Sequence, residues 1–523
     1  MNIQELTDYT VDTAPMTMEV KTEKLFPVNS STWRHVFRLD PSAGSFLDKN
    51  SMLMFKPVAK DGTVSAAGVR LNCWNGALSC LKRITLNIGD NQIEDIEGVG
   101  LWSAINALYM ASPDVQNKRL SHYLGNCLKY KISEDIVNSQ LTGGTSSNPG
   151  QILVDNVKSG IDYGNSAGGG AAAVRSHQIT NDADANNRMA IPIGMILNSI
   201  RNQTLPLFLF KDHRINIVVE FESLSSGFAN KMSNDSYAAD PVGGQGQSLA
   251  CADGDVRFTE VEMLVDYLVM PSSVQEQYRT ATAAEGGYDF EFVNVSRVLK
   301  TIPSATANAT QKQEHRLNFQ DQELHYVQQI KQLPPIPYAA AVADTSALRG
   351  AFSDKVLLDQ RSDSISVQSY QMNINGVDVF PQPYNNALTQ YNQLSYNLGR
   401  DIQIPKVLSV NDTNNEYGML TNSSMGIKGK FNVLAYDARN GNAGVKGAGT
   451  QVGAYPVNFI YYRKPHAVVS KGDFPQAAGG TGAVELGKDE TGALDVNYFV
   501  GTTRIVNVRQ LPSGGNAVAV MGA

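Results

Sequence analysis

The residue patterns in this chain that could support catalysis are few and poorly placed. Gly164-Asn165-Ser166-Ala167-Gly168 matches the G-x-S-x-G pattern of a nucleophile elbow, in which a sharp turn between a strand and a helix exposes the serine. The match stands inside a tract of glycine and alanine, without the alternating strands and helices that an α/β sheet requires. We therefore expect no nucleophilic serine.

Metal ligation is also weakly indicated. Asp182, Asp184 and Asn186 resemble the start of an EF-hand loop. The sixth position is Asn187 rather than glycine, and the twelfth is Ile193 rather than glutamate, so the loop cannot close around calcium in that way. The seven histidines form neither H-x-x-x-H nor H-E-x-x-H pairs, which are the usual zinc spacings. We expect no catalytic residue, no metal site, no cofactor and no enzyme activity.

Cysteine usage and charge exclude other classes. None of the four cysteines forms a C-x-x-C pair, so we expect free, mostly buried thiols in a reducing compartment. The net charge of −7 does not call for a nucleic-acid or anionic-membrane partner. The first twenty residues hold four acidic and no basic side chains, whereas an arm that grips nucleic acid should be basic. We expect no direct contact with nucleic acid.

The chain shows no targeting signal of its own. The N-terminal stretch MNIQELTDYTVDTAP has no hydrophobic core, so we expect no signal peptide. No run of 18 apolar residues occurs, which is the minimum for a spanning helix.

Strand patterns dominate the elements that would position any site. Ile84, Leu86 and Ile88 alternate with polar residues, and so do the residues of 261–269 and 288–292. Further strands are predicted at 364–374, 430–438, 457–465 and 496–511. Helical periodicity is confined to 101–110 and, more weakly, 387–394. This pattern predicts an all-β chain of sandwiches or barrels.

Long loops rich in small residues separate the strands. Compact domains rarely carry such loops without a use, so they are either surface decoration or assembly contacts. They comprise 142–176, 240–255, 438–454 and 476–493.

A weak internal repeat suggests two similar halves. Residues 84–108 and 370–394 both have the pattern strand, tight turn, short strand and helix, and Asn375-Gly376 is a strong hairpin signal. Residues 261–271 and 455–465 are both β-rich and end in proline, which cannot continue a central ladder. Either the chain is a duplicated β-sandwich, or two generic patterns coincide.

Several segments together resemble one family. Residues 24–58 look like its opening strands, and 76–109 like its strand, hairpin and short helix. Residues 202–222 resemble a late strand of its first domain, and 261–279 the last strand and the crossing to the second domain. The chain resembles the double jelly-roll major capsid proteins of double-stranded DNA viruses, of the type found in virophages, polinton-like viruses and large eukaryotic DNA viruses.

The resemblance implies two tandem eight-stranded antiparallel jelly-roll sandwiches with long surface loops and a few short helices. The implied domains are an N-terminal arm at 1–20, a first jelly roll at 21–272, a linker at 273–285, and a second jelly roll with a C-terminal extension at 286–523. The loops at 142–176, 240–255 and 438–454 are candidates for towers at the outer end of the shell.

The implied function is structural. Pseudo-hexagonal homotrimers would assemble into an icosahedral virion shell, with the same chain, neighbouring capsomers, penton proteins and minor capsid or cement proteins as partners. An internal viral membrane would be involved at most indirectly. The chain would be made inside the host cell, would not be secreted and would reside in the virion. The alternatives are a minor spike or vertex protein and a carbohydrate-binding β-sandwich, although the three tryptophans all lie within strand or helix patterns.

One segment is a candidate interface. Residues 215–222 alternate as a strand with one wet face, but the residues before them are apolar at both parities. Under the resemblance, one side would be covered by the sandwich core and the other by the neighbouring roll or the next subunit. The alternative is an ordinary buried strand in one core. The candidate residues are Leu205, Leu207, Phe208, Leu209 and Phe210.

Overall fold

The fold is taken from a computed structural model of the 523-residue chain. The structure describes residues 19–59, 69–71, 76–110, 178–179, 188–201, 203–222, 229–232, 248–250, 256–284, 286–306, 309–317, 323–332, 367–374, 376–380, 382–383, 433–438, 450–451, 456–463, 494–510 and 516–521.

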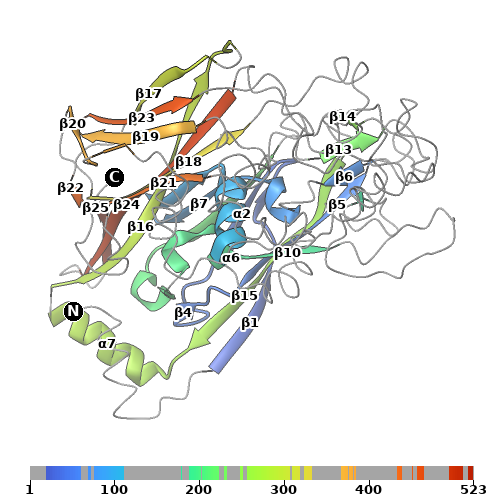
Figure 1. The fold of residues 1–523 in the computed structure, drawn as a ribbon. Coiled ribbons are helices and arrows are strands. Elements are labelled where there is room, and N and C mark those ends of the chain that lie inside the picture. The colour runs from blue at the N-terminus through green and yellow to red at the C-terminus, as the bar shows by residue number, and fades with distance from the viewer. Residues whose placement is uncertain are drawn as a thin grey trace, which may run out of the picture.

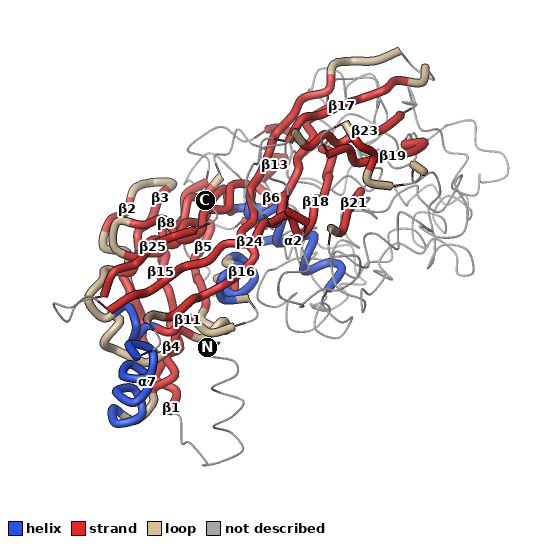
Figure 2. Tube along the Cα trace, turned by 90° about the vertical axis from the view of Figure 1, so that its left-hand side faces the viewer, coloured by secondary structure: helices blue, strands red, loops and turns tan. Residues whose placement is uncertain are grey.

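The first half of the chain folds into two antiparallel sheets (Figures 1 and 2). Sheet A has the order β10-β5-β15-β4-β11, with β1 also paired to β15, and sheet B has the order β2-β3-β12-β7-β8. The strands of sheet A are β1 (Glu19–Leu25), β4 (Phe46–Leu47), β5 (Met52–Ala59), β10 (Met189–Pro192), β11 (Leu205–Pro206) and β15 (Val256–Val269). Those of sheet B are β2 (Asn29–Ser30), β3 (Arg34–Leu39), β7 (Leu81–Ile88), β8 (Asn91–Glu97) and β12 (Ile215–Phe221).

Period-two patterning explains how these sheets face each other. In β12, Ile215, Ile217 and Val219 are fully buried, and Ile215 lies opposite both Leu39 of β3 and Ile88 of β7. Alternate side chains of a strand project to one face, so the apolar set lines the interior between the two sheets.

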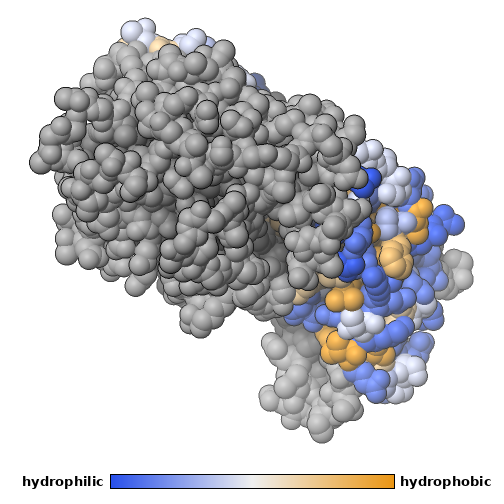
Figure 3. Space-filling view, turned by 90° about the vertical axis from the view of Figure 1, so that its right-hand side faces the viewer, coloured by the Kyte–Doolittle hydropathy of each residue, from blue (hydrophilic) through white to orange (hydrophobic). Residues whose placement is uncertain are grey.

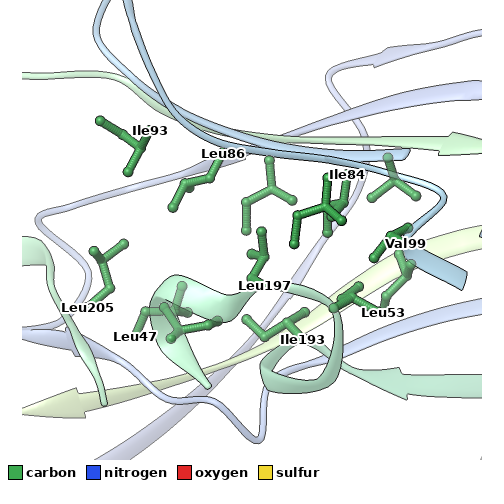
Figure 4. Packing of buried hydrophobic residues seen from close by; sticks show 14 of the residues in the cluster. Leu47, Leu53, Ile84, Leu86, Ile93, Val99, Ile193, Leu197 and Leu205 are labelled. Carbon is green, nitrogen blue, oxygen red and sulfur yellow. The ribbon is translucent and has the colours of Figure 1, made fainter. Parts of the chain in front are cut away.

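Short helices fill the space that the sheets leave between them. They are η1 (Gly76–Cys80), α2 (Val99–Met110), α6 (Ile193–Ile196), η3 (Asn198–Ile200) and η4 (Leu207–Phe210). In Figure 4, Leu197 lies between Leu47 of sheet A and Leu86 of sheet B. The predicted helix at 101–110 is confirmed, because it forms most of α2.

A third, small sheet lies beyond the first roll, at the upper right of Figure 1. Sheet C has the order β14-β13-β6-β9 and is built from β6 (Val69–Leu71), β9 (Gln178–Ile179), β13 (Ala229–Met232) and β14 (Ser248–Ala250). The stretch 240–255, which the sequence predicts to be loop, therefore contains a strand.

Helix α7 (Ser272–Ala284) leads from the first half to the second (Figure 1). Sheet D has the order β16-β24-β18-β21, with β22 beside β18 and β25 beside β24, and sheet E has the order β17-β23-β19-β20. Their strands are β16 (Tyr288–Ile302), β17 (Gln311–Leu317), β18 (Glu323–Gln332), β19 (Val367–Ile374), β20 (Val377–Asp378), β21 (Val433–Asp437), β22 (Thr450–Gln451), β23 (Val457–Arg463), β24 (Leu494–Gln510) and β25 (Asn516–Met521).

The two halves share a hairpin, as the internal repeat predicts. Ile88 pairs with Asn91 across the β7–β8 turn, and Ile374 pairs with Val377 across the β19–β20 turn, so both turns have two residues. Gly89 and Gly376 each adopt positive φ, at 60° and 78°, which tight hairpin turns require. The helical part of the second repeat, 387–394, lies outside the described residues.

The predicted all-β fold of tandem antiparallel sandwiches with few helices is confirmed. The exact domain limits stay a prediction. Strand β1 begins at Glu19, within the segment 1–20 that was predicted to be an arm, and the predicted linker 273–285 lies almost wholly in α7. The strand at 261–269 ends before Pro271 as expected, while Pro465 lies outside the described residues.

Candidate functional site

The predicted interface segment is buried within a single chain. Leu205, Leu207 and Phe210 are fully buried, and Phe208 and Leu209 are 4% and 3% exposed. Only residues 205–206 form a strand, and 207–210 form the 3₁₀ helix η4, so the expected strand at this point is wrong. Successive side chains of a 3₁₀ helix lie about 120° apart, and this explains why both parities are apolar.

Phe208 illustrates what covers the segment. Its ring meets Phe46 edge-on at 5.5 Å between centroids and lies 6.4 Å from the ring of Tyr278 in α7. Ser45 strengthens the same corner, because its hydroxyl accepts hydrogen bonds from the Gln275 side chain (2.9 Å) and from the Met270 backbone (2.8 Å). The segment is thus packed between the first roll and the linker helix. A contact between these residues and another copy stays a prediction.

One hydrophobic cluster joins the two rolls. It contains the residues of the first sandwich together with Phe290 and Phe292 of β16 and Phe499 and Val506 of β24. The other ends of these two long strands enter a second cluster, which contains Ile302 of β16. Because β16 and β24 pair along the whole length of β16, one rigid ribbon contributes to both cores.

Hydrogen bonds cross the same boundary. They run from Arg504 Nη1 to the Ile93 carbonyl (2.8 Å), from Asn198 Nδ2 to the Val293 carbonyl (2.5 Å), from Gln203 Nε2 to the Glu291 carbonyl (3.0 Å), from Asn91 Nδ2 to the Val518 carbonyl (2.9 Å), and from Arg297 Nη1 to Glu97 (3.1 Å). We call this boundary, with its shared cluster and these bonds, the inter-roll joint. In most of these hydrogen bonds the acceptor is a backbone carbonyl, so the bonds depend on the backbone conformation of each roll.

Glu94 is a fully buried acid next to the joint. Its Oε1 accepts from the Asn198 backbone N–H (2.6 Å) and its Oε2 from the Ser199 backbone N–H (3.0 Å), so the carboxylate holds η3 in place. Burial raises the pKa of Glu94 to about 7, against the lowering effect of these hydrogen bonds and of the Arg504 charge. Desolvation of the charged form dominates here.

A bulge in the β7–β8 pair brings this acid inside. Leu86 pairs with Glu94 and the next residue, Asn87, pairs with Gln92, so Ile93 is the extra residue. Sequence reasoning missed Glu94 because a regular strand would expose it. The sequence does contain a signal for the bulge, because Ile93 and Ile96 are both apolar but three residues apart, which breaks the two-residue period of a regular strand.

The buried polar groups of the second roll have a structural role. Gln329 Nε2 donates to the Tyr498 hydroxyl at 2.7 Å, and His315 Nδ1 lies 2.7 Å from the same oxygen. Burial holds the pKa of Tyr498 far above its usual range. The phenol therefore stays protonated.

Exposed large apolar side chains occur on both rolls. In Figure 3 hydrophobic patches lie among hydrophilic residues over the described part of one face. We define the exposed apolar set as Val20, Phe26 and Val28 of the first roll and Leu299, Val377 and Tyr462 of the second. Such groups are the surface that a partner could cover.

Several motifs find no support as sites within the described part of the chain. No group of three or more potential metal ligands occurs among the described residues, and no described helix is long and apolar enough to cross a membrane. The side chain of Cys80 is buried. Trp102 is buried, Trp33 is partly buried with its ring perpendicular to that of Phe258, and Trp74 lies outside the described residues. The stretches 164–168 and 182–187 lie outside the described residues.

Comparison with known proteins identifies the fold. No family model and no curated protein matches the sequence. The PBCV-1 protein VP54, fitted into a reconstruction of the virophage Sputnik, has a TM-score of 0.52 at 12% identity, with 97% of each chain covered. A quasi-atomic model of the PBCV-1 capsid has a TM-score of 0.52 at 13% identity, again with 97% of each chain covered.

The Sputnik virophage structure at 3.5 Å has a TM-score of 0.51 at 9% identity, and covers 98% of this chain and 90% of its own. These similarities extend over both rolls, so they concern the tandem arrangement and not one sandwich alone. The chain therefore has the double jelly-roll fold of viral major capsid proteins.

Proposed function

We propose that this chain is a major capsid protein, and that its function is to build an icosahedral virion shell from homotrimers. The observation that carries the proposal is the match of nearly the whole chain, both rolls included, to capsid proteins of PBCV-1 and Sputnik. The function needs no catalytic residue. It needs a rigid building block with surfaces that recognise further copies.

The inter-roll joint would supply the rigidity. Two sandwiches that share one hydrophobic cluster cannot rotate freely, so each copy presents two lobes in a fixed relation. Three such copies around an axis give six lobes and hence a pseudo-hexagonal outline. A ring of this kind uses heterologous contacts, in which different surfaces of neighbouring copies meet.

The exposed apolar set would form these contacts between copies. Phe26 is 65% exposed and Val377 is 69% exposed. Burial of one large apolar side chain contributes roughly 1.5–3 kcal/mol, and each contact recurs three times in a trimer. A few such residues per copy would therefore contribute to association, against the cost of fixing the copies relative to one another.

The finer partners follow from the same proposal. Neighbouring trimers, penton proteins and minor capsid or cement proteins would contact the block from outside, and an internal membrane would be involved only indirectly. The protein would reside in the virion after synthesis inside the host cell. A minor spike or vertex protein is the nearest alternative, because it could share the tandem fold.

The experiment is a mass measurement of the purified chain by size-exclusion chromatography with light scattering. One chain has a mass of 56.7 kDa, so a trimer has a mass of about 170 kDa. Phe26→Asp should shift the mass towards the monomer and leave the β-sheet circular dichroism unchanged. Gln277→Glu, an added charge on the exposed face of α7, is the matched control and should stay trimeric. A monomeric parent chain with affinity for sugars would contradict the proposal.

A further inference from the structure

Glu94 is placed where it can affect how the two rolls are held together. The carboxylate caps η3 through the backbone N–H groups of Asn198 and Ser199. The side chain of the same Asn198 donates to the Val293 carbonyl of β16, in the second roll. A single short helix thus connects the acid to the joint, and any change that moves the carboxylate is transmitted to a contact between the rolls.

Glu94 forms no ion pair with a described residue. Among the described residues, no lysine, arginine or histidine nitrogen lies within 4.0 Å of it. Arg504 of β24 attracts it from a greater distance, but donates its Nη1 to the Ile93 carbonyl (2.8 Å) and, more weakly, to the Asn294 amide of β16 (3.5 Å).

Neither β8 nor η3 contains a basic residue. Helix η3 offers only uncharged groups to the carboxylate. On β8 itself, Asp95 is negative and forms an ion pair with Arg83 of β7, at 2.5 Å. A charge buried without an ion pair costs several kcal/mol, so the group tends to take up a proton instead.

We propose that Glu94 makes the inter-roll joint proton-linked, so that the rolls are held more firmly in mildly acidic than in alkaline solution. This device belongs to the single chain and does not depend on whether the chain builds a shell. Its failure would leave the proposed capsid function untouched.

The sign follows from linkage. The pKa of Glu94 is raised from an ordinary 4.5 to about 7 in the folded chain. The folded state therefore binds a proton that the unfolded state releases between these values. The resulting stability is fully present below pH 4.5 and is lost as the pH rises through about 7. A difference of about 2.5 pKa units corresponds to roughly 300-fold in the unfolding equilibrium constant.

The test compares the full chain, Glu94→Gln and the control Glu276→Gln, whose carboxylate is exposed on α7. Urea unfolding between pH 5 and pH 8.5 gives the stability of each. Glutamine cannot ionise, so the stability of Glu94→Gln relative to the parent should rise between pH 5 and pH 8.5, by about 75-fold in the unfolding equilibrium constant. A hydrogen bond lost in the variant would change its free energy of unfolding by the same amount at every pH. The control should follow the parent.

Hydrogen exchange in the parent chain keeps the proposal testable if the variant does not fold. After correction for the intrinsic rate, peptides covering 198–200 and 291–295 should exchange faster at pH 8 than at pH 6. A difference between parent and Glu94→Gln that does not change with pH would overturn the proposal. So would equal protection of these peptides at both pH values, because the proton would then not act at the joint.

Discussion

Substitution of Phe208 separates a buried packing role from a role between subunits. Its side chain is 4% exposed and lies against Phe46 and Tyr278. Phe208→Ala should therefore lower the free energy of unfolding by about 3–5 kcal/mol, the usual loss for a core phenylalanine. Phe208→Asp should be worse, because it also buries a carboxylate that lacks a partner. We expect this variant to be largely unfolded.

Phe26 provides the comparison within the same roll. It is 65% exposed, so Phe26→Ala should change the free energy of unfolding by no more than about 0.5 kcal/mol. Urea titrations followed by circular dichroism measure both effects, and light scattering reports the assembly state. A soluble monomeric Phe208→Asp with sheet content and stability close to the parent would refute the packing argument, and would place this residue in a subunit contact instead.

The remaining predictions concern backbone packing and pH. Gly100→Ala in α2 should lower the free energy of unfolding, measured by urea titration, by about 1–3 kcal/mol, because the added Cβ would lie 2.0 Å from the Leu78 carbonyl oxygen. This clash should outweigh the helix propensity of alanine, which favours the variant by about 1 kcal/mol. A variant more stable than the parent would contradict the prediction. Burial lowers the pKa of His35 below its ordinary 6.5, so the folded state resists protonation and the stability contributed by neutral His35 should be lost as the pH falls below 6.5. Urea titrations between pH 5 and pH 8 should therefore show the stability of His35→Gln rising relative to that of the parent as the pH falls. A stability difference between the two that is the same at every pH would exclude this role of His35.

The strands were predictable where one face meets the core and the other meets water. β12 alternates except at Val218, β7 alternates from Ile84 to Ile88, and the two-residue turn before Val377 follows from Asn375-Gly376. These features depend on local sequence, since the side-chain period and the turn residues are both short-range signals. The family resemblance then supplied the tandem arrangement that local signals cannot give.

The inter-roll joint could not be predicted in the same way. The sequence shows that the stretch forming β24, which has 17 residues, is long and β-rich. It does not show that Phe499 packs in the cluster of the first roll and Tyr498 in the cluster of the second. The stretch 207–210 is apolar at every position, and a short apolar run does not distinguish a buried strand from a 3₁₀ turn. Both features are decided by contacts between distant parts of the chain.

Electron cryomicroscopy of the purified chain tests most directly whether the chain is a double jelly-roll building block of a shell. If it is, the particles should be threefold with six lobes, two from each copy, and β16 and β24 should run without a break through the inter-roll joint. Particles in which one chain forms a single lobe, or in which the two lobes take variable relative orientations, would contradict it.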